Sequence, residues 1–297
     1  MPTRPRRPLT AEQRRRADVA RTDKLDALHQ HLAEQVRALR TGEDWQRWLS
    51  FAGRFHSYSF ANTSLILSAR PDATYVAGYK RWQSMGRQVR LGQKGIPILV
   101  PLHGAAVEET DPLSDDPVVH RPLVGFSVGH VWDVSQTDGP PVPNFKIDLG
   151  DDVGPLLGAA VALAGERGIG VQFRPLLGTA NGLSELGNVI INSARTVGVQ
   201  AQTILHELGH EAMHDRQSRV EGNRALHEGE AEACAWAALQ HFGVTGTMNN
   251  AAAYIRSHHA QPRDLLLSLE RITSTAHELT TGIERHLPPE LRPRPFP

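Results

Sequence analysis

The chain has almost no cysteine and no long apolar run. Cys234 is the only cysteine in 297 residues, which excludes an internal disulfide and fits a reducing compartment. No stretch approaches the roughly 20 apolar residues that a membrane-spanning helix needs. The basic segment at the start is not followed by an apolar run, unlike a secretory signal. We therefore expect a cytoplasmic protein without a membrane partner.

The chain also lacks a net charge, but its two signs are segregated. Lysine plus arginine number 32, as do aspartate plus glutamate. Residues 1–100 hold 18 basic against 8 acidic residues, whereas residues 101–297 hold 14 against 24. Without the first 22 residues, the basic half still holds 11 against 6. This excess is larger than a basic tail explains, so it predicts an anionic partner for the first half.

Apolar periodicity predicts a mixed α+β chain. Hydrophobic residues make up 40% of the sequence, which is enough for sizeable cores. A basic tail runs into a first helix that carries Leu25, Leu28 and Leu32 at helical spacing. Further helices are predicted over about 43–53, 60–70, 151–167, 197–215, 226–242 and 249–286. The predicted strands are Thr74–Ala77, Gln88–Leu91, Ile96–Val100, Gly125–Val134, 170–174 and, at a sheet edge, Asn188–Asn192.

Turn-forming residues predict how these elements are joined. Gly92–Gly95 is expected to form a hairpin turn between two of the strands. Residues 106–120 are acidic and contain two prolines, which predicts a surface loop. The run Asp138–Asn144 is rich in glycine and proline and poor in core-forming residues. It is the predicted boundary between two α+β domains.

The strongest chemical signal is the run His206-Glu207-Leu208-Gly209-His210. Residues four apart lie on one face of a helix, so both imidazoles can bind one zinc ion. Ile204 and Leu205 make the preceding turn apolar, as the motif requires. The glutamate lies to the side of that face, where it can take a proton from the attacking water. The motif predicts one zinc ion with Glu207 as catalytic base.

Two histidines require a third ligand. Met213 stands where a metzincin has glycine, and no late histidine follows, which excludes that class. The next carboxylates are Glu228, Glu230 and Glu232, on a predicted helix. We assign Glu228 as the ligand and Glu232 as the carboxylate that orients a ligand histidine. The main rival ligand is Glu230, and two flanking histidines remain alternatives: His214 and His227.

This ligand set predicts gluzincin-like peptide hydrolysis. Zinc lowers the pKa of its water toward roughly 7. Glu207 would accept the proton and pass it to the leaving amine. The strand Asn188–Asn192 would pair with an extended peptide by strand addition. The sequence names no protein substrate, and a His/His/Glu site also accepts other divalent ions.

Residues 45–94 interleave aromatic residues with cations. Aromatic faces stack unpaired bases while lysine and arginine bind phosphates, a combination typical of single-stranded nucleic-acid binding. Trp48, Phe51 and Phe55 fall at helical spacing and are predicted to be core residues. The residues predicted to be exposed contacts, near turns marked by glycine, are Tyr58, Trp82, Arg87, Arg90 and Lys94.

Several runs of the first half match a known family in order. They are Tyr58-Ser-Phe-x-Asn62, Arg70-Pro-Asp-Ala-Thr-x-Val-Ala-Gly-Tyr79, Trp82, Gly86-Arg87-x-Val89, Lys94-Gly-Ile96 and Val134-Ser-Gln-Thr137. These runs resemble the N-terminal domain of ArdC-type antirestriction proteins. The His206–His210 run and the Glu228–Glu232 run also resemble ImmA/IrrE-type regulatory metallopeptidases. The resemblance covers about residues 41–286.

The resemblance implies an α+β protein with two domains. Residues 41–140 would be a single-stranded DNA-binding domain, preceded by a basic tail and helix over 1–40. Residues 145–290 would be a zincin-like metallopeptidase domain. Three more residues join the implied DNA contacts: Asn62, Lys80 and Arg81. The family implies a protein of mobile genetic elements that protects incoming DNA from restriction.

The chain departs from the family at two places. The turn Leu91-Gly-Gln-Lys-Gly95 has lost two charges relative to the family's Lys-Gly-Glu-Lys-Gly run. The acidic stretch 106–120 is not expected of the core domain.

The sequence is compatible with three functions. The first is antirestriction by binding single-stranded DNA, with a metal domain that is structural or proteolytic. The second is a regulatory protease that cleaves a protein such as a repressor or a restriction enzyme. The third is a binding protein whose zincin fold is catalytically silent. A silent site has no need of Glu207, so the intact motif argues against the third function.

Overall fold

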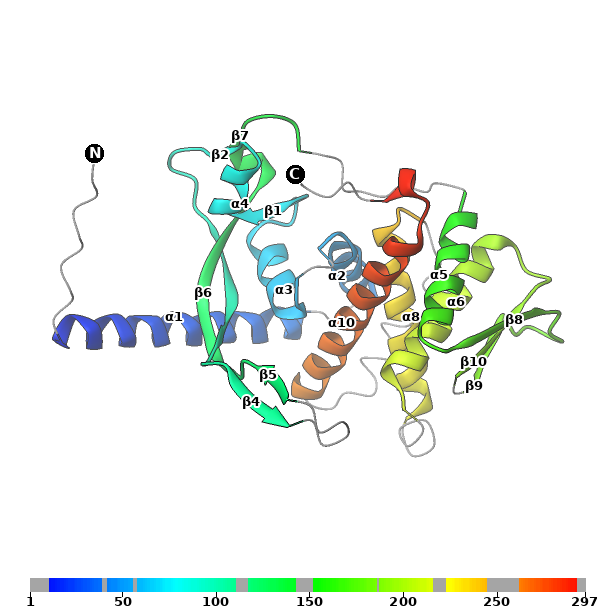
Figure 1. The fold of residues 1–297 in the computed structure, drawn as a ribbon. Coiled ribbons are helices and arrows are strands. Elements are labelled where there is room, and N and C mark those ends of the chain that lie inside the picture. Colours follow the sequence, from blue (N-terminus) through cyan, green and yellow to red (C-terminus); the bar gives the residue numbers. More distant parts are fainter. Residues whose placement is uncertain are drawn as a thin grey trace.

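The computed structural model describes residues 11–38, 42–55, 58–110, 117–142, 152–185, 187–215, 223–244 and 262–292. Two groups of elements follow each other along the chain (Figure 1). The first combines helices with a small antiparallel sheet, and the second combines helices with a mixed sheet. The predicted α+β class is therefore confirmed. Within the described residues, no helix is both long enough and apolar enough to cross a membrane.

The first sheet has three strands in the order β1-β6-β3, with bounds Val76–Gly78, Leu123–Asp133 and Ile96–His103. All pairs are antiparallel, with Val131 opposite both Gly78 and Ile96. Residues 100–103 of β3 are exposed, whereas Leu99 is buried, and so are Ile96 and Ile98, which share one face of the strand. These two isoleucines pack with Phe51 and Ile66 of the two adjacent helices, α2 (Gly42–Arg54) and α3 (Phe60–Ala69).

The predicted hairpin at Gly92–Gly95 is wrong. Strand β2 (Gln88–Val89) pairs with β7 (Thr137–Asp138), whereas β3 pairs with β6. The side chain of Gln136 lies in the gap: its amide nitrogen donates to the carbonyl of Lys94 (2.9 Å) and to the side chain of Gln93 (3.2 Å). The backbone carbonyl of Lys94 is thus bound by a side chain from another part of the sequence.

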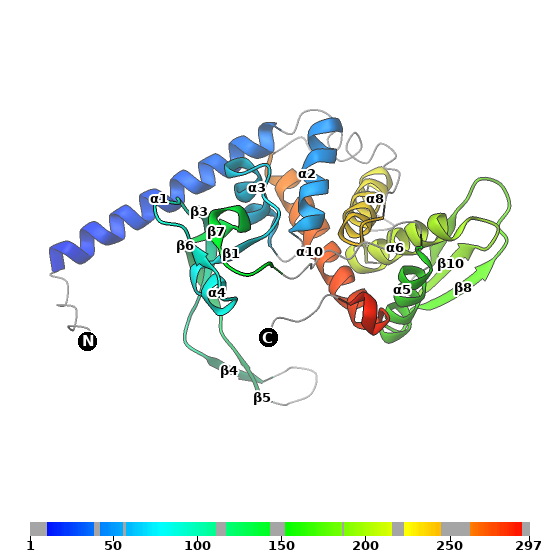
Figure 2. The same ribbon diagram turned by 90° about the horizontal axis from the view of Figure 1, so that it is seen from above.

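The acidic stretch 106–120 also departs from its prediction as a loop. Val107–Thr110 forms β4 and Pro117–His120 forms β5, and the two strands pair antiparallel. Residues 111–116 lie outside the described chain. The pair continues the long β3–β6 ladder as an arm that extends from the body (Figure 2). The β-branched residues of both strands outweigh the acidic composition that suggested a loop.

Helix α1 (Ala11–Ala38) is long, and its second half packs against the body. Leu32 packs against the main core, and His31 Nε2 lies 2.8 Å from the hydroxyl of Ser68 on α3. The first half projects away from the rest of the molecule in both ribbon views (Figures 1 and 2). The predicted helix is confirmed over these residues.

The second sheet has the order β8-β10-β9, with bounds Gly170–Arg174, Asn188–Asn192 and Gly182–Glu185. Strand β10 is parallel to β8 and antiparallel to β9. The prediction that Asn188–Asn192 is an edge strand is therefore wrong. Its consecutive buried residues Val189, Ile190 and Ile191 are typical of a central strand. The two edge strands are β8 and β9, and β9 was not predicted from the sequence.

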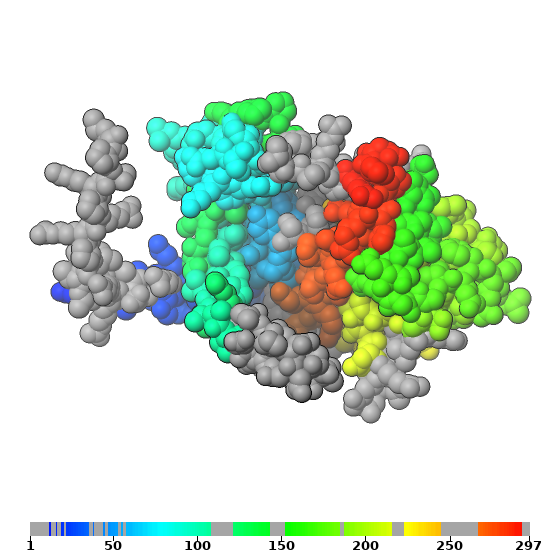
Figure 3. Space-filling model, viewed as in Figure 1, coloured from blue at the N-terminus to red at the C-terminus, as the bar shows by residue number. Residues whose placement is uncertain are grey.

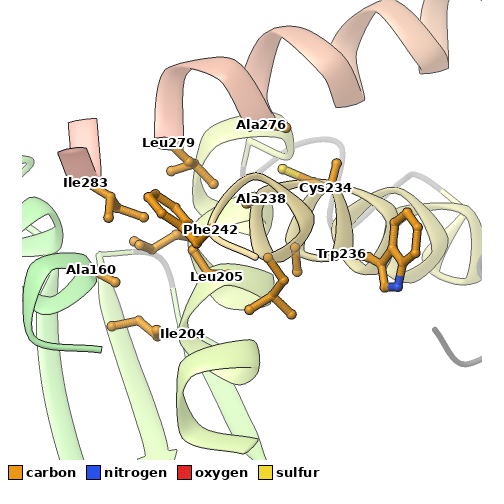
Figure 4. Packing of buried hydrophobic residues seen from close by; sticks show 14 of the residues in the cluster. Ala160, Ile204, Leu205, Cys234, Trp236, Ala238, Phe242, Ala276, Leu279 and Ile283 are labelled. Carbon is orange, nitrogen blue, oxygen red and sulfur yellow. The ribbon is translucent and has the colours of Figure 1, made fainter. Parts of the chain in front are cut away.

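Helices lie on one side of this sheet and form the largest core. They are α5 (Gly154–Glu166), α6 (Val197–Met213), α8 (Arg224–His241) and α10 (Pro262–His286). Leu205 of α6, Phe242 after α8 and Ile283 of α10 meet at the centre (Figure 4). In the space-filling view, α10 lies directly against α5 (Figure 3). The helices predicted over 151–167, 197–215 and 226–242 are confirmed. Of the last predicted helix, 249–286, residues 262–286 are confirmed as α10, and residues 249–261 lie outside the described chain.

The largest core also includes residues from the first half of the chain. Trp48 and Leu49 of α2 and Phe60 of α3 belong to the same buried cluster as α8 and α10. The indole nitrogen of Trp48 donates to the hydroxyl of Ser64 (3.0 Å). The core thus crosses the predicted boundary at 138–144, so α2 and α3 stabilise both halves. Separation into two independent domains stays a prediction.

Candidate metal centre and nucleic-acid interface

Helix α6 places the two motif histidines together. The helix begins after Thr196, whose side chain accepts a hydrogen bond from the backbone nitrogen of Val199 (3.4 Å). Apolar residues of the helix are buried in the main core, which fixes its rotation. The Nε2 atoms of His206 and His210 then lie 3.1 Å apart. Both imidazoles therefore present a nitrogen to one point.

Helix α8 adds a carboxylate at the same point. Oε2 of Glu228 lies 3.4 Å from Nε2 of His206 and 3.6 Å from Nε2 of His210. One atom from each side chain falls within 4.8 Å of the others. Hydrogen bonds from the two histidines hold the pKa of Glu228 far below its usual range. Two imidazole nitrogens and one ionised carboxylate are a suitable donor set for a divalent ion such as zinc.

His206 has a second carboxylate behind it. Its Nδ1 is buried without a hydrogen-bond partner, and Oε2 of Glu232 lies 3.5 Å away. Burial by itself would lower the pKa of His206, but Glu228 and Glu232 outweigh it and raise that pKa to about 9. The structure thus brings Glu232 to the side of His206 that faces away from Glu228, as expected for an orienting carboxylate.

Glu207 lines the same cavity as the three candidate ligands. The cavity has a volume of about 650 Å³, and Glu207 is only 7% exposed. Edge strand β9 forms one wall through Gly182, Leu183 and Ser184. A Cβ atom at Gly182 would lie 2.4 Å from the side chain of Thr203 and 3.2 Å from Oε1 of Glu207. Only glycine allows β9 to approach α6 so closely.

Glu211, on the next turn of α6, was missed from the sequence. Its carboxylate accepts hydrogen bonds from the hydroxyl of Ser184 (2.5 Å) and the backbone nitrogen of Gly187 (2.9 Å). These contacts hold β9 and the turn after it against the helix. Glu211 follows His210 directly in sequence, but its partners lie on strand β9, which the sequence did not predict, and in the turn after that strand.

The alternative ligand Glu230 does not face the candidate ligands. Its side chain is fully buried and bonds His214 Nε2 (2.9 Å), Arg271 Nη2 (2.6 Å) and the hydroxyl of Ser268. Burial would raise the pKa of Glu230, but these partners outweigh it and lower the pKa to about 2. The alternative that Glu230 binds the metal is therefore disfavoured, because its carboxylate is occupied elsewhere.

The two flanking histidines lie beside the cluster. Nδ1 of His214 is 3.0 Å from Nδ1 of His210, on the side of that ring opposite Nε2. His227 stacks on His214, with ring centroids 4.2 Å apart, and also lines the cavity. Cys234 is buried among apolar side chains, as predicted for helix packing.

Three of the residues predicted to contact DNA have structural roles. Trp82 is fully buried and its indole nitrogen donates to the carbonyl of Trp132 (2.9 Å). Tyr58 is half-buried and donates to the carbonyl of Val76 (3.2 Å), and burial raises the pKa of its phenol to about 12. The expected exposure of Tyr58 and Trp82 is therefore wrong. Trp82 turns inward because it lies on a short helix, α4 (Tyr79–Ser84), that was not predicted.

Asn62 also has a structural role. Its amide nitrogen donates to the carbonyl of Leu99 (2.8 Å), and its amide oxygen accepts from the backbone nitrogen of Leu99 (2.8 Å). This paired contact fixes α3 to strand β3. The match of Asn62 to the family run therefore has a structural explanation.

Two of the arginines predicted to contact DNA donate hydrogen bonds to the segment that follows β6. Arg87 donates to the hydroxyl and carbonyl of Thr137 (2.8 and 3.0 Å) and to Gly139 (3.0 Å). Its guanidinium also lies 5.8 Å from the Trp82 ring centroid. Arg90 lies 3.3 Å from Asp138 and donates to the carbonyl of Ser135. The three remaining cations of the predicted set are exposed: Lys80, Arg81 and Lys94.

An aromatic cluster near these cations was not assembled from the sequence. It consists of Tyr79, His130 and Trp132. The ring centroids of Tyr79 and His130 lie 6.0 and 6.4 Å from that of Trp132, and Tyr79 is 41% exposed. A Cβ at Gly95 would lie 2.8 Å from the Trp132 ring, so glycine lets the chain beside Lys94 approach it. The alternation of side chains along a strand could have revealed part of this cluster, because His130 and Trp132 are two residues apart and share one face of β6.

Comparisons with known proteins support the resemblance stated from the sequence. Residues 23–121 match the family described as the N-terminal domain of anti-restriction factor ArdC. A metal-free crystal structure of the antirestriction protein ArdC from plasmid R388 is similar at 19% identity, covering 76% of this chain and 84% of that chain, with a TM-score of 0.47. Its Mn(II)-bound structure is similar at 17% identity, covering 76% and 83%, with a TM-score of 0.46. No curated protein sequence matches.

Proposed function

We propose that this chain, whose residues 23–121 belong to the ArdC N-terminal domain family, is a cytoplasmic antirestriction protein of a mobile genetic element. In this proposal, the first half binds single-stranded DNA, and the second half is a zincin-like domain with a divalent metal site. The family match is the observation that carries the antirestriction role. The cluster of His206, His210 and Glu228 supports the metal site.

The exposed side of the first sheet supports the DNA-binding part. The aromatic cluster offers ring faces for unpaired bases, and Lys80 and Lys94 adjoin it in sequence through Tyr79 and Gly95. Exposed lysine and arginine beside aromatic rings suit a strand whose bases are unstacked. We propose Tyr79, Lys80, Arg81 and Lys94 as contacts. Tyr58, Asn62 and Trp82 would shape this surface from within.

Replacing Tyr79 with alanine should weaken binding of a single-stranded oligonucleotide by about 5- to 150-fold, because stacking of one base contributes roughly 1–3 kcal/mol. Fluorescence anisotropy of a labelled oligonucleotide measures this. The matched control is Phe173→Ala, which removes an aromatic ring of similar exposure (44%) from β8 in the other sheet. Equal losses in both variants, or none in Tyr79→Ala, would place the DNA elsewhere.

The metal half is proposed to hydrolyse a peptide bond. When bound, the ion would supply Lewis-acid activation of the carbonyl and of water. Glu207 lies in the same cavity and would take the proton of the attacking water, then give it to the leaving amine. Among the described residues, β9 pairs with a strand on one side alone, so its other side is available to an extended peptide. This role moves from Asn188–Asn192, where the sequence placed it, to Gly182–Glu185.

A second candidate function is an ImmA/IrrE-type regulatory protease that cleaves a repressor. The buried Glu207 favours it, because a metal site that is merely structural has no use for a base in its cavity. The substitution Glu207→Gln separates the two functions.

A further inference from the structure

A chain of hydrogen bonds leads away from the metal centre on the far side of His210. The Nε2 atom of this histidine faces His206 and Glu228. Its Nδ1 lies 3.0 Å from Nδ1 of His214, whose Nε2 lies 2.9 Å from Oε2 of Glu230. The side chains of His214 and Glu230 are 2% and 0% exposed. Contacts this well buried are shielded from exchange with water.

The chain ends on two donors from α10. The other carboxylate oxygen of Glu230 accepts hydrogen bonds from Arg271 Nη2 (2.6 Å) and from the hydroxyl of Ser268. The guanidinium compensates the buried negative charge and is itself 44% exposed. A buried carboxylate with a cation and two further donors is well satisfied, so it forms a fixed acceptor for His214.

These contacts determine where each proton lies. Ionised Glu230 accepts only, so His214 must donate from Nε2. A neutral imidazole has one donor and one acceptor, so Nδ1 of His214 accepts. His210 therefore donates from its own Nδ1, and its Nε2 keeps a free lone pair. That lone pair is directed at the point shared with His206 and Glu228.

We propose that His214 and Glu230 are positioning residues that hold His210 in the tautomer and orientation required for metal binding. Arg271 and Ser268 act one step further out by fixing Glu230. This inference rests on the proposed metal centre and deepens it. These hydrogen bonds run from His214, which follows the last residue of α6, through Glu230 on α8 to α10.

The substitutions His214→Asn and His214→Gln distinguish the positioning role of His214 from a role in side-chain packing alone. The amide oxygen of asparagine is as many bonds from Cα as Nδ1 of histidine, so it can accept from His210. The amide nitrogen of glutamine is as many bonds from Cα as Nε2, so it can donate to Glu230. His214→Asn therefore restores the contact that the proposal requires, whereas His214→Gln restores only the contact to the carboxylate.

The experiment measures zinc affinity by competition with a chromophoric chelator, using the full-length wild type, His214→Asn, His214→Gln and His214→Ala. Loss of such an orienting partner lowers metal affinity by roughly 10- to 100-fold. We expect this loss in the alanine and glutamine variants and a smaller loss in His214→Asn. Thermal unfolding of the metal-free proteins shows in parallel whether each variant is folded.

Each outcome is decisive. A higher zinc affinity in His214→Asn than in His214→Gln supports the proposal, even if all variants unfold at lower temperature than wild type. The proposal would be overturned if His214→Gln bound zinc with wild-type affinity, or more tightly than His214→Asn. His214 would then have only a role in packing against Glu230. A wild-type protein that binds no zinc would overturn the proposed metal centre together with this inference, and leave DNA binding untouched.

Discussion

Replacing Glu228 with alanine should remove the metal ion from the purified protein. Glu228 supplies the charged ligand of the cluster, within 3.4 and 3.6 Å of the two imidazole nitrogens. Two neutral imidazoles alone leave a divalent ion without charge compensation or a third protein ligand. We expect one zinc ion per chain in wild type and none retained by the variant after gel filtration. Elemental analysis gives the metal content, and chelator competition with zinc and manganese gives the affinities.

The matched control for this change is His227→Ala. His227 precedes Glu228 on α8 and lines the same cavity, but it stacks on His214 rather than joining the ligand cluster. It should keep the ion. The side chain of Glu228 is 46% exposed, so its removal should leave thermal unfolding of the metal-free protein nearly unchanged. Stoichiometric zinc in Glu228→Ala, or its loss in His227→Ala, would show that the third ligand is misassigned.

The substitution Glu207→Gln should abolish peptide hydrolysis while leaving metal and DNA bound. Loss of a general base costs about 100- to 10,000-fold in rate. Glutamine matches the shape of glutamate, which matters because Glu207 is buried and close to the wall at Gly182. Zinc content and oligonucleotide anisotropy should equal those of wild type. Cleavage is followed on a candidate repressor or restriction enzyme by mass spectrometry.

The same variant decides between the two candidate functions in cells. Under the antirestriction proposal with DNA binding as its basis, Glu207→Gln should still protect incoming unmodified DNA from restriction. Transfer efficiency of such DNA into a restricting host measures this. If protection disappears while DNA binding persists, proteolysis carries the function, and the regulatory-protease alternative replaces our proposal.

The local motifs were predictable because their partners lie within one or two helical turns. The spacing of His206 and His210 places both rings on one face of α6 whatever surrounds the helix. Glu228 required a further assumption, that the next helix packs against the first. That assumption succeeded because the apolar residues of both helices contribute to a single core.

The features that escaped prediction depend on partners far along the chain. Trp82 looked exposed because it lies near glycines, but its hydrogen-bond acceptor is the carbonyl of Trp132, fifty positions later. Strand β9 is short, and its place at the edge is decided by pairing with β10 and by Gly182 against α6. Glu230 looked like a rival ligand because its donors Ser268 and Arg271 lie on α10, a helix whose contact with α8 could not be read from spacing.

Anisotropy of a labelled single-stranded oligonucleotide, with a duplex control and a series of salt concentrations, tests the central claim most directly. Our account predicts preference for the single strand and an affinity that falls steeply with salt, because bases stack on the aromatic cluster and cations bind phosphates. Absence of binding at low salt, or equal binding of the duplex, would contradict it. The basic half would then be a surface for docking a protein or duplex DNA.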